Sequence, residues 1–418
     1  MKLIRVAACT LNQTPLAWDD NRRHIASAID RARQAGASLL CLPELCITGY
    51  GCEDAFLASA THETALEVLL EMLPLTHGMA VSVGLPIRYN KANYNACCLV
   101  VDGEIRGFVA KRALAGDGIH YEPRWFKPWP LGRRTTLTVA GREYPLGDVH
   151  FDLGGVKIGF EICEDAWVAK RPGLELALEA VDIILNPSAS HFAFGKYAVR
   201  DRLVLEGSRA FGVSYVYANL LGNEAGRAIY DGDALIATQG QIVARATRFG
   251  FSDLELVTAV VDIDNTRSRH SGLSGFDPDL SSENSRVRVP FVLPAVEPES
   301  VQQSACAWEQ GPHVKEEEFA RATALALFDY LRKSRSQGFV VSLSGGADSS
   351  AVACLVRLMV ALGVAELTLE GFVERLGYVR GLIRDMMRAR LLLRVGFNVN
   401  RLLLFSVSHW AALSPGFT

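Results

Sequence analysis

The sequence has little excess charge of either sign. Its 418 residues include 43 Lys and Arg against 46 Asp and Glu, so the formal net charge is −3. A polyanion-binding protein carries a clear basic excess, and this balance argues against nucleic acid as a partner. Hydrophobic residues make up 49% of the chain and charged residues 21%, a composition that excludes wholesale disorder and leaves ample apolar surface to bury.

The sequence also lacks an apolar run of the length that a membrane-spanning helix needs. The longest run, Ala351 to Leu367, is interrupted by Arg357 and falls short of the ~20 apolar residues required. Residues Met1 to Cys9 lack the apolar core and cleavage site of a signal peptide, and they are typical of a first β-strand. We therefore expect a cytoplasmic protein without a membrane segment.

Paired cysteines are missing as well. The nine cysteines are odd in number and contain no CxxC pair, so neither a disulfide framework nor a zinc site is predicted. We expect most of them to be small buried residues in a reducing compartment. They are Cys9, Cys41, Cys46, Cys52, Cys97, Cys98, Cys163, Cys306 and Cys354.

Up to about residue 275 the sequence alternates β-like runs with helical patterns, which predicts an α/β domain over residues 1–275. Asp20 to Ala35 places apolar side chains on one helical stripe, with Gly36 available as a C-terminal cap. Asp102-Gly103 between two β-like runs predicts a hairpin. The other strand candidates are Ser38 to Leu42, Ala80 to Leu85, Asn95 to Val101, Val156 to Ile162, Asp182 to Leu185, Val213 to Ala218 and Leu235 to Ala244.

Pro, Ser, Asp and Glu dominate residues 276–315, which we interpret as a linker. A second domain is expected over residues 316–418. Near its start, Lys315 to Lys333 predicts a helix, because its acidic first turn and basic last turn match the helix dipole.

Three polar residues stand where predicted strands end. Glu44 follows an apolar run, Lys111 closes the Asp-Gly hairpin, and Cys163 ends the run Lys157 to Ile162. Alone, each has an ordinary structural interpretation as a cap, a side chain that covers a sheet edge, or a buried thiol. The ends of strands are also where open α/β sheets usually place chemistry.

The surroundings of Cys163 favour a catalytic interpretation. The usual pKa of a thiol is about 8.5, and the neighbouring Glu164 and Asp165 should raise it further. A nucleophilic Cys163 would therefore need a base to take its proton and a cation to stabilise the oxyanion of a tetrahedral intermediate. Glu44 can act as that base and Lys111 as that cation, without any histidine.

The order Pro43-Glu44, Lys111 and Glu161 to Trp167 resembles the nitrilase, or carbon-nitrogen hydrolase, superfamily. That resemblance implies an αββα nitrilase-type sandwich. Further segments resemble the glutaminase domain of glutamine-dependent NAD synthetases, over roughly residues 3–275. They are Thr48 to Asp54, Gly118 to Phe126, Asn186 to Ser190 and Tyr230 to Gly232.

The resemblance implies a role for each catalytic candidate. Glu44 would be the general base, Lys111 the oxyanion stabiliser and Cys163 the nucleophile that forms a glutamyl thioester. Glu122 matches a second glutamate that helps to hold the catalytic lysine and the substrate. Hydrolysis of glutamine at this site would need no cofactor.

The same resemblance implies four glutamine-binding positions: Tyr50, Glu164, Ser190 and Lys196. A cation at 196 suits the α-carboxylate of glutamine, and a carboxylate suits its α-ammonium group. Asp117 departs from the pattern, because some branches have a tyrosine there that contacts glutamine. Without the resemblance, Ser190 and Lys196 would be equally well explained as a surface loop.

The second predicted domain contains a strand from Gly338 to Leu343, a glycine-rich turn, and a helix from Ala351 to Leu362. This order presents backbone N–H groups and a positive helix end to an anion. The spacing GxxxxGK[ST] is absent, but SGGADS resembles the pyrophosphate-binding loop of doubly wound α/β ATP pyrophosphatases. That resemblance implies ATP as co-substrate, with Mg²⁺ near Asp348. The implied ATP-binding residues are Ser344, Gly345, Gly346, Asp348, Ser349 and Ser350.

Only 69 residues follow Ser349, whereas a domain typically has about 100 to 200. From residue 371 onward, seven arginines stand against two acidic residues, a net charge of +5 that leaves −8 for the first 370 residues. We expect a truncated or frame-shifted, and so partial, ATP-pyrophosphatase domain. The alternative is a shortened domain in which Leu369 to Arg394 forms helices with a solvated arginine-rich face.

Three interpretations of function follow. The first is a glutamine-hydrolysing NAD synthetase, a ligase of NAD biosynthesis in which ammonia from glutamine serves the ATP-dependent amidation of nicotinic acid adenine dinucleotide, with the ligase half impaired. The second is a stand-alone glutaminase or amidase. The third, a non-catalytic assembly partner, is least favoured because Glu44, Lys111 and Cys163 are all present in order. We expect a homo-oligomer, because nitrilase-type domains tend to associate.

Overall fold

The computed structural model describes residues 2–224, 226–271, 285–299, 306–342, 344 and 346–379. Within these residues the chain forms two compact units. The first combines Met1–Arg248 with Asp253–Gln310, and the second combines Phe249–Ser252 with the residues from Gly311 onward.

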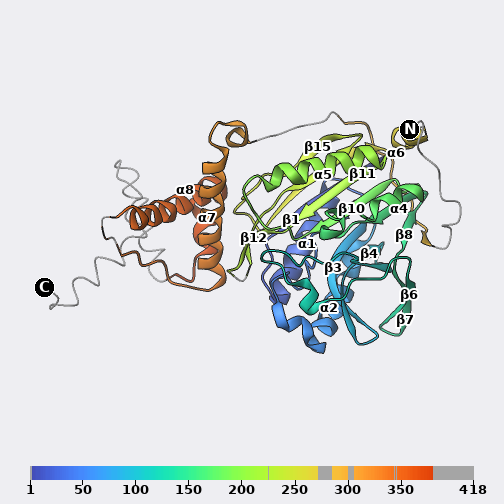
Figure 1. Ribbon diagram of the computed structural model, residues 1–418, viewed down its shortest axis with the longest axis horizontal. Helices are drawn as coiled ribbons and strands as arrows, with labels where there is room; N and C mark the ends of the chain where they lie inside the picture. The colour runs from blue at the N-terminus through green and yellow to red at the C-terminus, as the bar shows by residue number, and fades with distance from the viewer. Residues whose placement is uncertain are drawn as a thin grey trace. The chain divides into compact units, whose positions relative to one another are not determined.

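Two β-sheets form the centre of the first unit (Figure 1). Among the described residues, one sheet has eight strands in the order β16-β1-β2-β3-β4-β5-β7-β6, and the other has seven in the order β15-β14-β11-β10-β9-β8-β17. The strands of the first sheet are β1 (Leu3–Leu11), β2 (Leu39–Cys41), β3 (Ala80–Tyr89), β4 (Ala92–Val101), β5 (Glu104–Ala110), β6 (Arg134–Val139), β7 (Arg142–Gly147) and β16 (Leu254–Asp262). Those of the second are β8 (His150–Leu153), β9 (Val156–Phe160), β10 (Ile183–Ser188), β11 (Ser214–Asn219), β14 (Ala234–Thr238), β15 (Gln241–Arg245) and β17 (Arg286–Val289).

The longer helices of this unit cover the outer faces of the two sheets. The longer ones are α1 (Trp18–Gln34), α2 (Ser59–Met72) and α5 (Lys196–Ala210). The shorter ones are α3 (Glu122–Trp125), α4 (Gly173–Leu178), α6 (Ile263–Ser271) and the 3₁₀ helices η1 (Glu53–Leu57), η2 (Leu73–Thr76), η3 (Cys163–Ala166) and η5 (Ala307–Gln310). A separate hairpin consists of β12 (Leu221–Glu224) and β13 (Ala228–Asp231).

Alternation along the strands builds the layers. Successive side chains of a strand point to opposite faces. In β1, Val6 lies in the core between the sheets, while Ala7 lies in the core with α1 and α2. In β10, Leu185 faces the core between the sheets, while Ile184 packs with side chains of α4 and α5. The layers are therefore helix, sheet, sheet, helix, which confirms the predicted αββα sandwich.

Two turn signals in the sequence are confirmed. Gly36 has a φ of 73°, the left-handed conformation that ends α1. Asp102-Gly103, with φ values of 52° and 79°, joins β4 to β5. The single strand predicted from Leu235 to Ala244 is wrong. It is an antiparallel hairpin of β14 and β15, joined at Gln239-Gly240, whose residues both have positive φ.

The segment 276–315, predicted as a linker, adds a strand to the first unit. Arg286–Val289 forms β17 and pairs in parallel with β8 at the sheet edge. Val289 is buried in the core between the sheets, and Val287 packs against it. Alternating arginine and valine is the period-two pattern of a strand, and the polar composition of the surrounding residues concealed it.

The second unit contains two helices in its described residues, α7 (Val314–Lys333) and α8 (Ala347–Arg375). They pack through an apolar cluster that includes Phe328, Met359 and Phe372. The predicted strand is not formed over Gly338 to Ser342, and Leu343 lies outside the described residues. A strand needs a neighbour for its backbone hydrogen bonds, and the described residues of this unit supply none.

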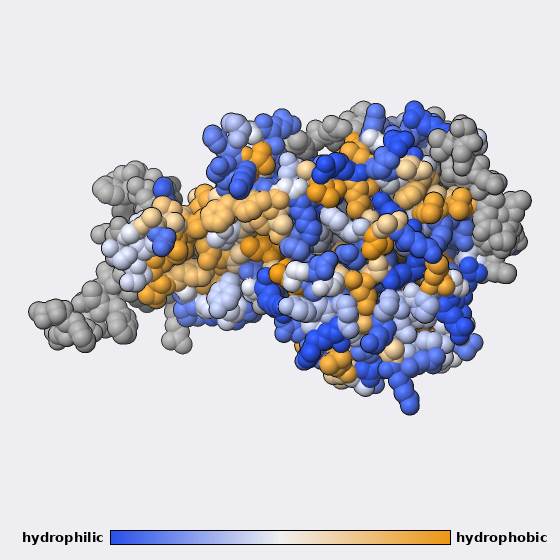
Figure 2. Space-filling model, viewed as in Figure 1, coloured by the Kyte–Doolittle hydropathy of each residue, from blue (hydrophilic) through white to orange (hydrophobic). Residues whose placement is uncertain are grey.

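Helix α8 is longer than the apolar run that we identified in the sequence. By length and composition it is the one helix in the described ranges that could cross a membrane, which is weak evidence by itself. Thr368 has φ 64° and ψ 166°, so the backbone is not helical there and the span is two helices. Figure 2 shows hydrophobic residues along the exposed surface of α8. The absence of a membrane segment therefore stays a prediction.

A close backbone contact holds the segment that carries Glu44. A Cβ at Gly84 of β3 would lie 2.4 Å from the Leu45 nitrogen and 2.7 Å from the Pro43 oxygen. Glycine at position 84 therefore lets this segment lie directly against the strand.

We expect Gly84→Ala to lower the free energy of unfolding by about 1–3 kcal/mol, because the added methyl group must displace backbone. Gly116→Ala is the matched control, since a Cβ there would meet only the Pro123 ring at 3.4 Å. Chemical denaturation of both variants measures the effect. Equal stabilities for Gly84→Ala and the unmodified chain would contradict the steric argument.

Candidate active site

The predicted catalytic side chains come from separate elements that end close together. Glu44 follows β2, Lys111 follows β5, Glu122 is the first residue of α3, and Cys163 is the first residue of η3 after β9. All four side chains are buried. β2 and β5 belong to one sheet and β9 to the other, so the site joins both sheets of the sandwich.

Lys111 is the centre of the cluster. Its Nζ donates to Glu44 Oε1 at 2.6 Å and to the two Glu122 oxygens at 2.8 and 2.9 Å. Burial by itself would lower the pKa of the Lys111 ammonium, but the charges of Glu122 and Glu44 outweigh burial and raise that pKa well above its usual value. Lys111 is therefore a fixed cation.

Asn95 of β4 bridges the two carboxylates. Its Nδ2 donates to Glu44 Oε1 at 2.7 Å and to Glu122 Oε1 at 3.2 Å. Asn95 was not among the site residues predicted from the sequence. The available signal was a polar side chain at the start of an otherwise apolar predicted strand, Asn95 to Val101.

Glu44 is arranged to accept a proton. Its Oε1 is occupied by Lys111 and Asn95, whereas its buried Oε2 has no hydrogen-bond partner among the described residues. Burial raises the pKa of the Glu44 carboxyl to about 7, although the Lys111 charge opposes the rise. A carboxylate with such a pKa and a vacant oxygen is suited to general-base catalysis near neutral pH.

The Cys163 thiol lies within the electrostatic influence of this cluster. Burial raises its pKa, the Glu44 charge raises it further, and the Lys111 charge opposes both. The sulfur is therefore a thiol at neutral pH. The direction of this pKa shift agrees with the sequence prediction, but its causes are burial and Glu44 rather than the adjacent Glu164 and Asp165. Cys163 has a φ of 47°, a left-handed conformation that is strained for a residue with a side chain and is typical of functional positions.

Asp165 ties the nucleophile segment to the lysine segment. Its Oδ1 accepts the backbone N–H groups of Arg112 at 3.0 Å and Ala113 at 2.7 Å, and its Oδ2 accepts that of Ile162 at 3.0 Å. These bonds connect the two sheets beside Lys111 and Cys163. In the sequence, Asp165 stood out only as part of a motif and as a charge beside Cys163, because spacing does not reveal its backbone partners.

The four predicted glutamine-binding residues surround the cluster in different ways. Tyr50 is buried, and its OH donates to Glu122 Oε1 at 3.0 Å. Ser190 is buried, and its Oγ has no partner among the described residues. Lys196 begins α5 and holds its Nζ 5.5 Å from the centre of the Trp167 ring. The pKa of the half-buried Glu164 carboxyl is raised by burial, against the Lys111 charge.

Asp117 and the predicted ATP-binding residues of the second unit are the remaining site candidates. Asp117 is exposed, and its contact with a substrate stays untested. In the second unit, Gly346 caps α8, and the hydroxyls of Ser349 and Ser350 donate to its carbonyl at 3.2 and 2.9 Å. Ser344 and Asp348 are exposed beside this helix end, and Gly345 lies outside the described residues.

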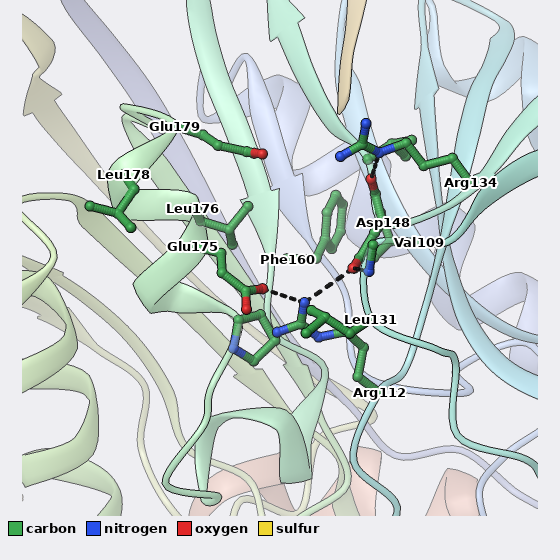
Figure 3. Close-up of a pocket in the computed structure, with 13 residues that line it drawn as sticks. Val109, Arg112, Leu131, Arg134, Asp148, Phe160, Glu175, Leu176, Leu178 and Glu179 are labelled. Carbon is green, nitrogen blue, oxygen red and sulfur yellow. Dashed lines mark hydrogen bonds and ion pairs between the residues drawn. The ribbon is translucent and has the colours of Figure 1, made fainter. Parts of the chain in front are cut away.

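A cavity of about 300 Å³ lies next to the residue that follows Lys111 (Figure 3). Arg112 extends into it between Asp148 and Glu175, with Nη1 3.2 Å from Asp148 Oδ2. The rest of its wall combines apolar side chains, including Phe160 and Leu176, with the charged Arg134 and Glu179. The predicted catalytic residues do not line this cavity. Its ion pairs hold the side chain of Arg112, the residue next to Lys111.

Comparisons with known proteins divide the chain in the same way as the structure. Residues 5–270 match the carbon-nitrogen hydrolase family, and residues 319–371 match the NAD synthase family. Glutamine-dependent NAD(+) synthetases from Oryza sativa subsp. indica and Homo sapiens are 36% and 34% identical, over 88% and 92% of this chain. These alignments cover 52% and 56% of the two relatives, so the chain spans about half the length of the curated relatives it matches.

Solved structures agree with the fold. A glutamine-dependent NAD(+) synthetase from Cytophaga hutchinsonii is 42% identical, with a TM-score of 0.74 over 90% of this chain and 55% of that one. An amidase from Nesterenkonia sp. has a TM-score of 0.51 at 21% identity, over 65% of this chain and 94% of the amidase. At that identity the amidase supports the fold alone.

Alkylation by 2-chloroacetamide tests the pairing of Glu44 with Cys163. Below pH 7 Glu44 is protonated and cannot accept the thiol proton, so we expect the rate at Cys163 to rise as pH rises through about 7. Glu44→Gln should lower the rate at pH 8 at least about tenfold. Peptide mass spectrometry also measures alkylation of the exposed Cys354, whose rate at each pH should be the same in Glu44→Gln and in the unmodified chain. An identical pH profile at Cys163 in Glu44→Gln would contradict the pairing.

Proposed function

The chain belongs to the carbon-nitrogen hydrolase family, and on that basis we propose that its first unit hydrolyses the side-chain amide of glutamine. One observation carries the proposal. The cation Lys111 and the vacant Oε2 of Glu44 are held in one buried cluster whose charges act on the Cys163 thiol. This is the set of groups that acyl transfer through a thiol requires.

The first half of the reaction releases ammonia. Glu44 Oε2 takes the thiol proton while Sγ of Cys163 attacks the amide carbon. The Lys111 ammonium stabilises the oxyanion of the tetrahedral intermediate. Glu44 then gives the proton to the amide nitrogen, the C–N bond breaks, ammonia leaves, and a glutamyl thioester remains on Cys163.

The second half regenerates the thiol. Glu44, again a carboxylate, takes a proton from water while the water oxygen attacks the thioester carbon. Lys111 stabilises the second oxyanion. The C–S bond breaks, the sulfur regains a proton from Glu44, and glutamate leaves. Lys111 stays charged because its neighbours Glu122 and Glu44 hold its pKa well above the usual value, and Lys111 gives up no proton in either half-reaction.

We propose that the whole protein is a glutamine-dependent NAD synthetase. Two observations support this proposal: the similarity to glutamine-dependent NAD(+) synthetases and the match of residues 319–371 to the NAD synthase family. ATP would activate the carboxylate of nicotinic acid adenine dinucleotide as an adenylate, and ammonia from the first unit would displace AMP. The loop Ser344 to Gly346 before α8 would bind the phosphates through backbone N–H groups at the helix end.

A magnesium ion would be held beside the phosphates. Asp348 is the acidic residue in the first turn of α8, and a carboxylate oxygen is a ligand that Mg²⁺ prefers. Such an ion usually binds through one or two carboxylates and the phosphates themselves, so Asp348 fits this role without a larger cluster. The ion would neutralise charge on the phosphates of ATP.

A stand-alone glutaminase or amidase is the second candidate. It is favoured by the completeness of the first unit, in contrast to the two helices described for the second. In either case we propose a cytoplasmic homo-oligomer, because the nine free cysteines suit a reducing compartment and nitrilase-type sandwiches tend to associate.

Cys163→Ala separates the two half-reactions. We expect the variant to lose glutamine hydrolysis because no nucleophile remains, measured as ammonia release. NAD formation from nicotinic acid adenine dinucleotide, ATP and added ammonium chloride, which we expect to be impaired in this chain, should be equal in the variant and the unmodified chain because the second unit is unchanged. Only the unmodified chain should also form NAD with glutamine as the nitrogen source.

Each outcome is decisive. Ammonia release without NAD formation from either nitrogen source would select the stand-alone glutaminase. Ammonia release close to that of the unmodified chain in Cys163→Ala would refute the assignment of the nucleophile. Circular dichroism of the variant establishes that it is folded.

A further inference from the structure

A chain of hydrogen bonds leads from Glu122 to Lys196. Tyr50 OH lies 3.0 Å from Glu122 Oε1 and 3.1 Å from His120 Nδ1. His120 Nε2 lies 2.8 Å from His191 Nδ1, and the same His191 nitrogen lies 3.3 Å from Lys196 Nζ. The two histidines therefore join a predicted catalytic carboxylate to a predicted substrate-binding cation.

Both histidines are neutral at physiological pH. Burial lowers the pKa of His120 to about 3, with further contributions from His191, Lys196 and Lys111. Burial also lowers the pKa of His191 to about 4, helped by Lys196 and Arg200 and opposed by Asp231. A neutral imidazole carries one N–H and one lone pair, so each ring donates from one nitrogen and accepts at the other.

The hydrogen bonds from Lys196 to Glu122 can run in two opposite directions, depending on which nitrogen of each histidine carries the proton. His191 Nδ1 carries either a proton or a lone pair. With a proton, it donates to His120 Nε2, His120 Nδ1 donates to the Tyr50 oxygen, and Tyr50 OH donates to Glu122. In this direction Lys196 faces an N–H group, and its ammonium is left for another acceptor.

In the opposite direction His191 Nδ1 carries the lone pair. Lys196 Nζ and His120 Nε2 then compete as donors for this single lone pair, and His120 Nδ1 becomes an acceptor. The single proton of Tyr50 OH is then divided between His120 Nδ1 and Glu122 Oε1. Glu122 keeps the Lys111 and Asn95 bonds but loses part of the Tyr50 bond.

We propose that His120 and His191 are positioning residues that couple binding of a carboxylate at Lys196 to the hydrogen bonding of Glu122. The coupling rests on the proposed function, in which the carboxylate is the α-carboxylate of glutamine. An anion bound to Lys196 draws its ammonium away from the His191 Nδ1 lone pair. The tautomer with a proton on His191 Nδ1 is then favoured, and the hydrogen bonds run from His191 toward Glu122. Tyr50 then donates fully to Glu122, which holds Lys111 for the oxyanion.

The coupling makes the site respond to substrate. An amide without the α-carboxylate leaves the ammonium of Lys196 on His191 and leaves Glu122 with a weaker set of donors. Such an amide therefore has a lower kcat than glutamine, in addition to any change in KM. Couplings between binding sites typically change affinity by about 5- to 150-fold, and we expect a difference in kcat of about tenfold here.

The test compares glutamine with 4-aminobutanamide, which lacks only the α-carboxylate. The kcat ratio of the two amides is measured for the unmodified chain, His120→Phe, His191→Phe and His191→Asn. The phenylalanine variants keep a ring but remove the nitrogens, so the ratio of about tenfold should fall toward one. Most of that fall should come from kcat for glutamine.

His191→Asn is the rescue variant. An asparagine amide places a donor and an acceptor near the position of Nδ1, so this variant should keep most of the kcat ratio. A structural role alone would change stability in all three variants without restoring the ratio in His191→Asn. Thermal unfolding of each variant measures that stability.

The outcomes distinguish this inference from the proposed function. If the unmodified chain hydrolyses glutamine but His120→Phe and His191→Phe keep its kcat ratio, the coupling is refuted and the glutaminase stands. If the unmodified chain hydrolyses neither amide, both are refuted. Loss of the ratio in the phenylalanine variants with recovery in His191→Asn supports the coupling.

Discussion

The first unit depends on one buried ammonium shared by two carboxylates. An isolated charge at Lys111 would be strongly disfavoured in the interior, and Glu44 and Glu122 offset that cost at distances of 2.6 and 2.8 Å. The set still carries one excess negative charge. Asn95, Tyr50 and the Ala115 N–H donate to the carboxylates and stabilise that charge. The chemistry follows from this arrangement, because every carboxylate oxygen of Glu44 and Glu122 has a hydrogen-bond donor among the described residues except Glu44 Oε2.

The sandwich fold explains why the arrangement needs residues so far apart in sequence. Glu44, Asn95 and Lys111 come from the sheet of β1, whereas Cys163 comes from the sheet of β9. Packing between the sheets sets their separation, and Asp165 fixes it locally by accepting backbone N–H groups from both segments.

The sequence predicts the reacting groups better than the groups that hold them. Glu44, Lys111 and Cys163 can be found because strand ends and residue chemistry are local features. Asn95, Asp165 and the pair His120 and His191 act through partners that only the folded chain supplies. The same limit applies to the fold. Alternation and turn residues predict α1 and the β4–β5 hairpin, whereas β17 was concealed by its polar surroundings and the strand predicted from Gly338 lacks a described neighbour. The roles of the site residues and the boundaries of the domains stay predictions.

The most direct measurement of the central claim is the identity of the covalent intermediate. The full chain is mixed with glutamine, quenched in acid within one turnover, digested and examined by peptide mass spectrometry. The account predicts a glutamyl group on the peptide that contains Cys163, removable by hydroxylamine as expected of a thioester. Turnover of glutamine with Cys163 unmodified, or with the glutamyl group on another residue, would contradict it.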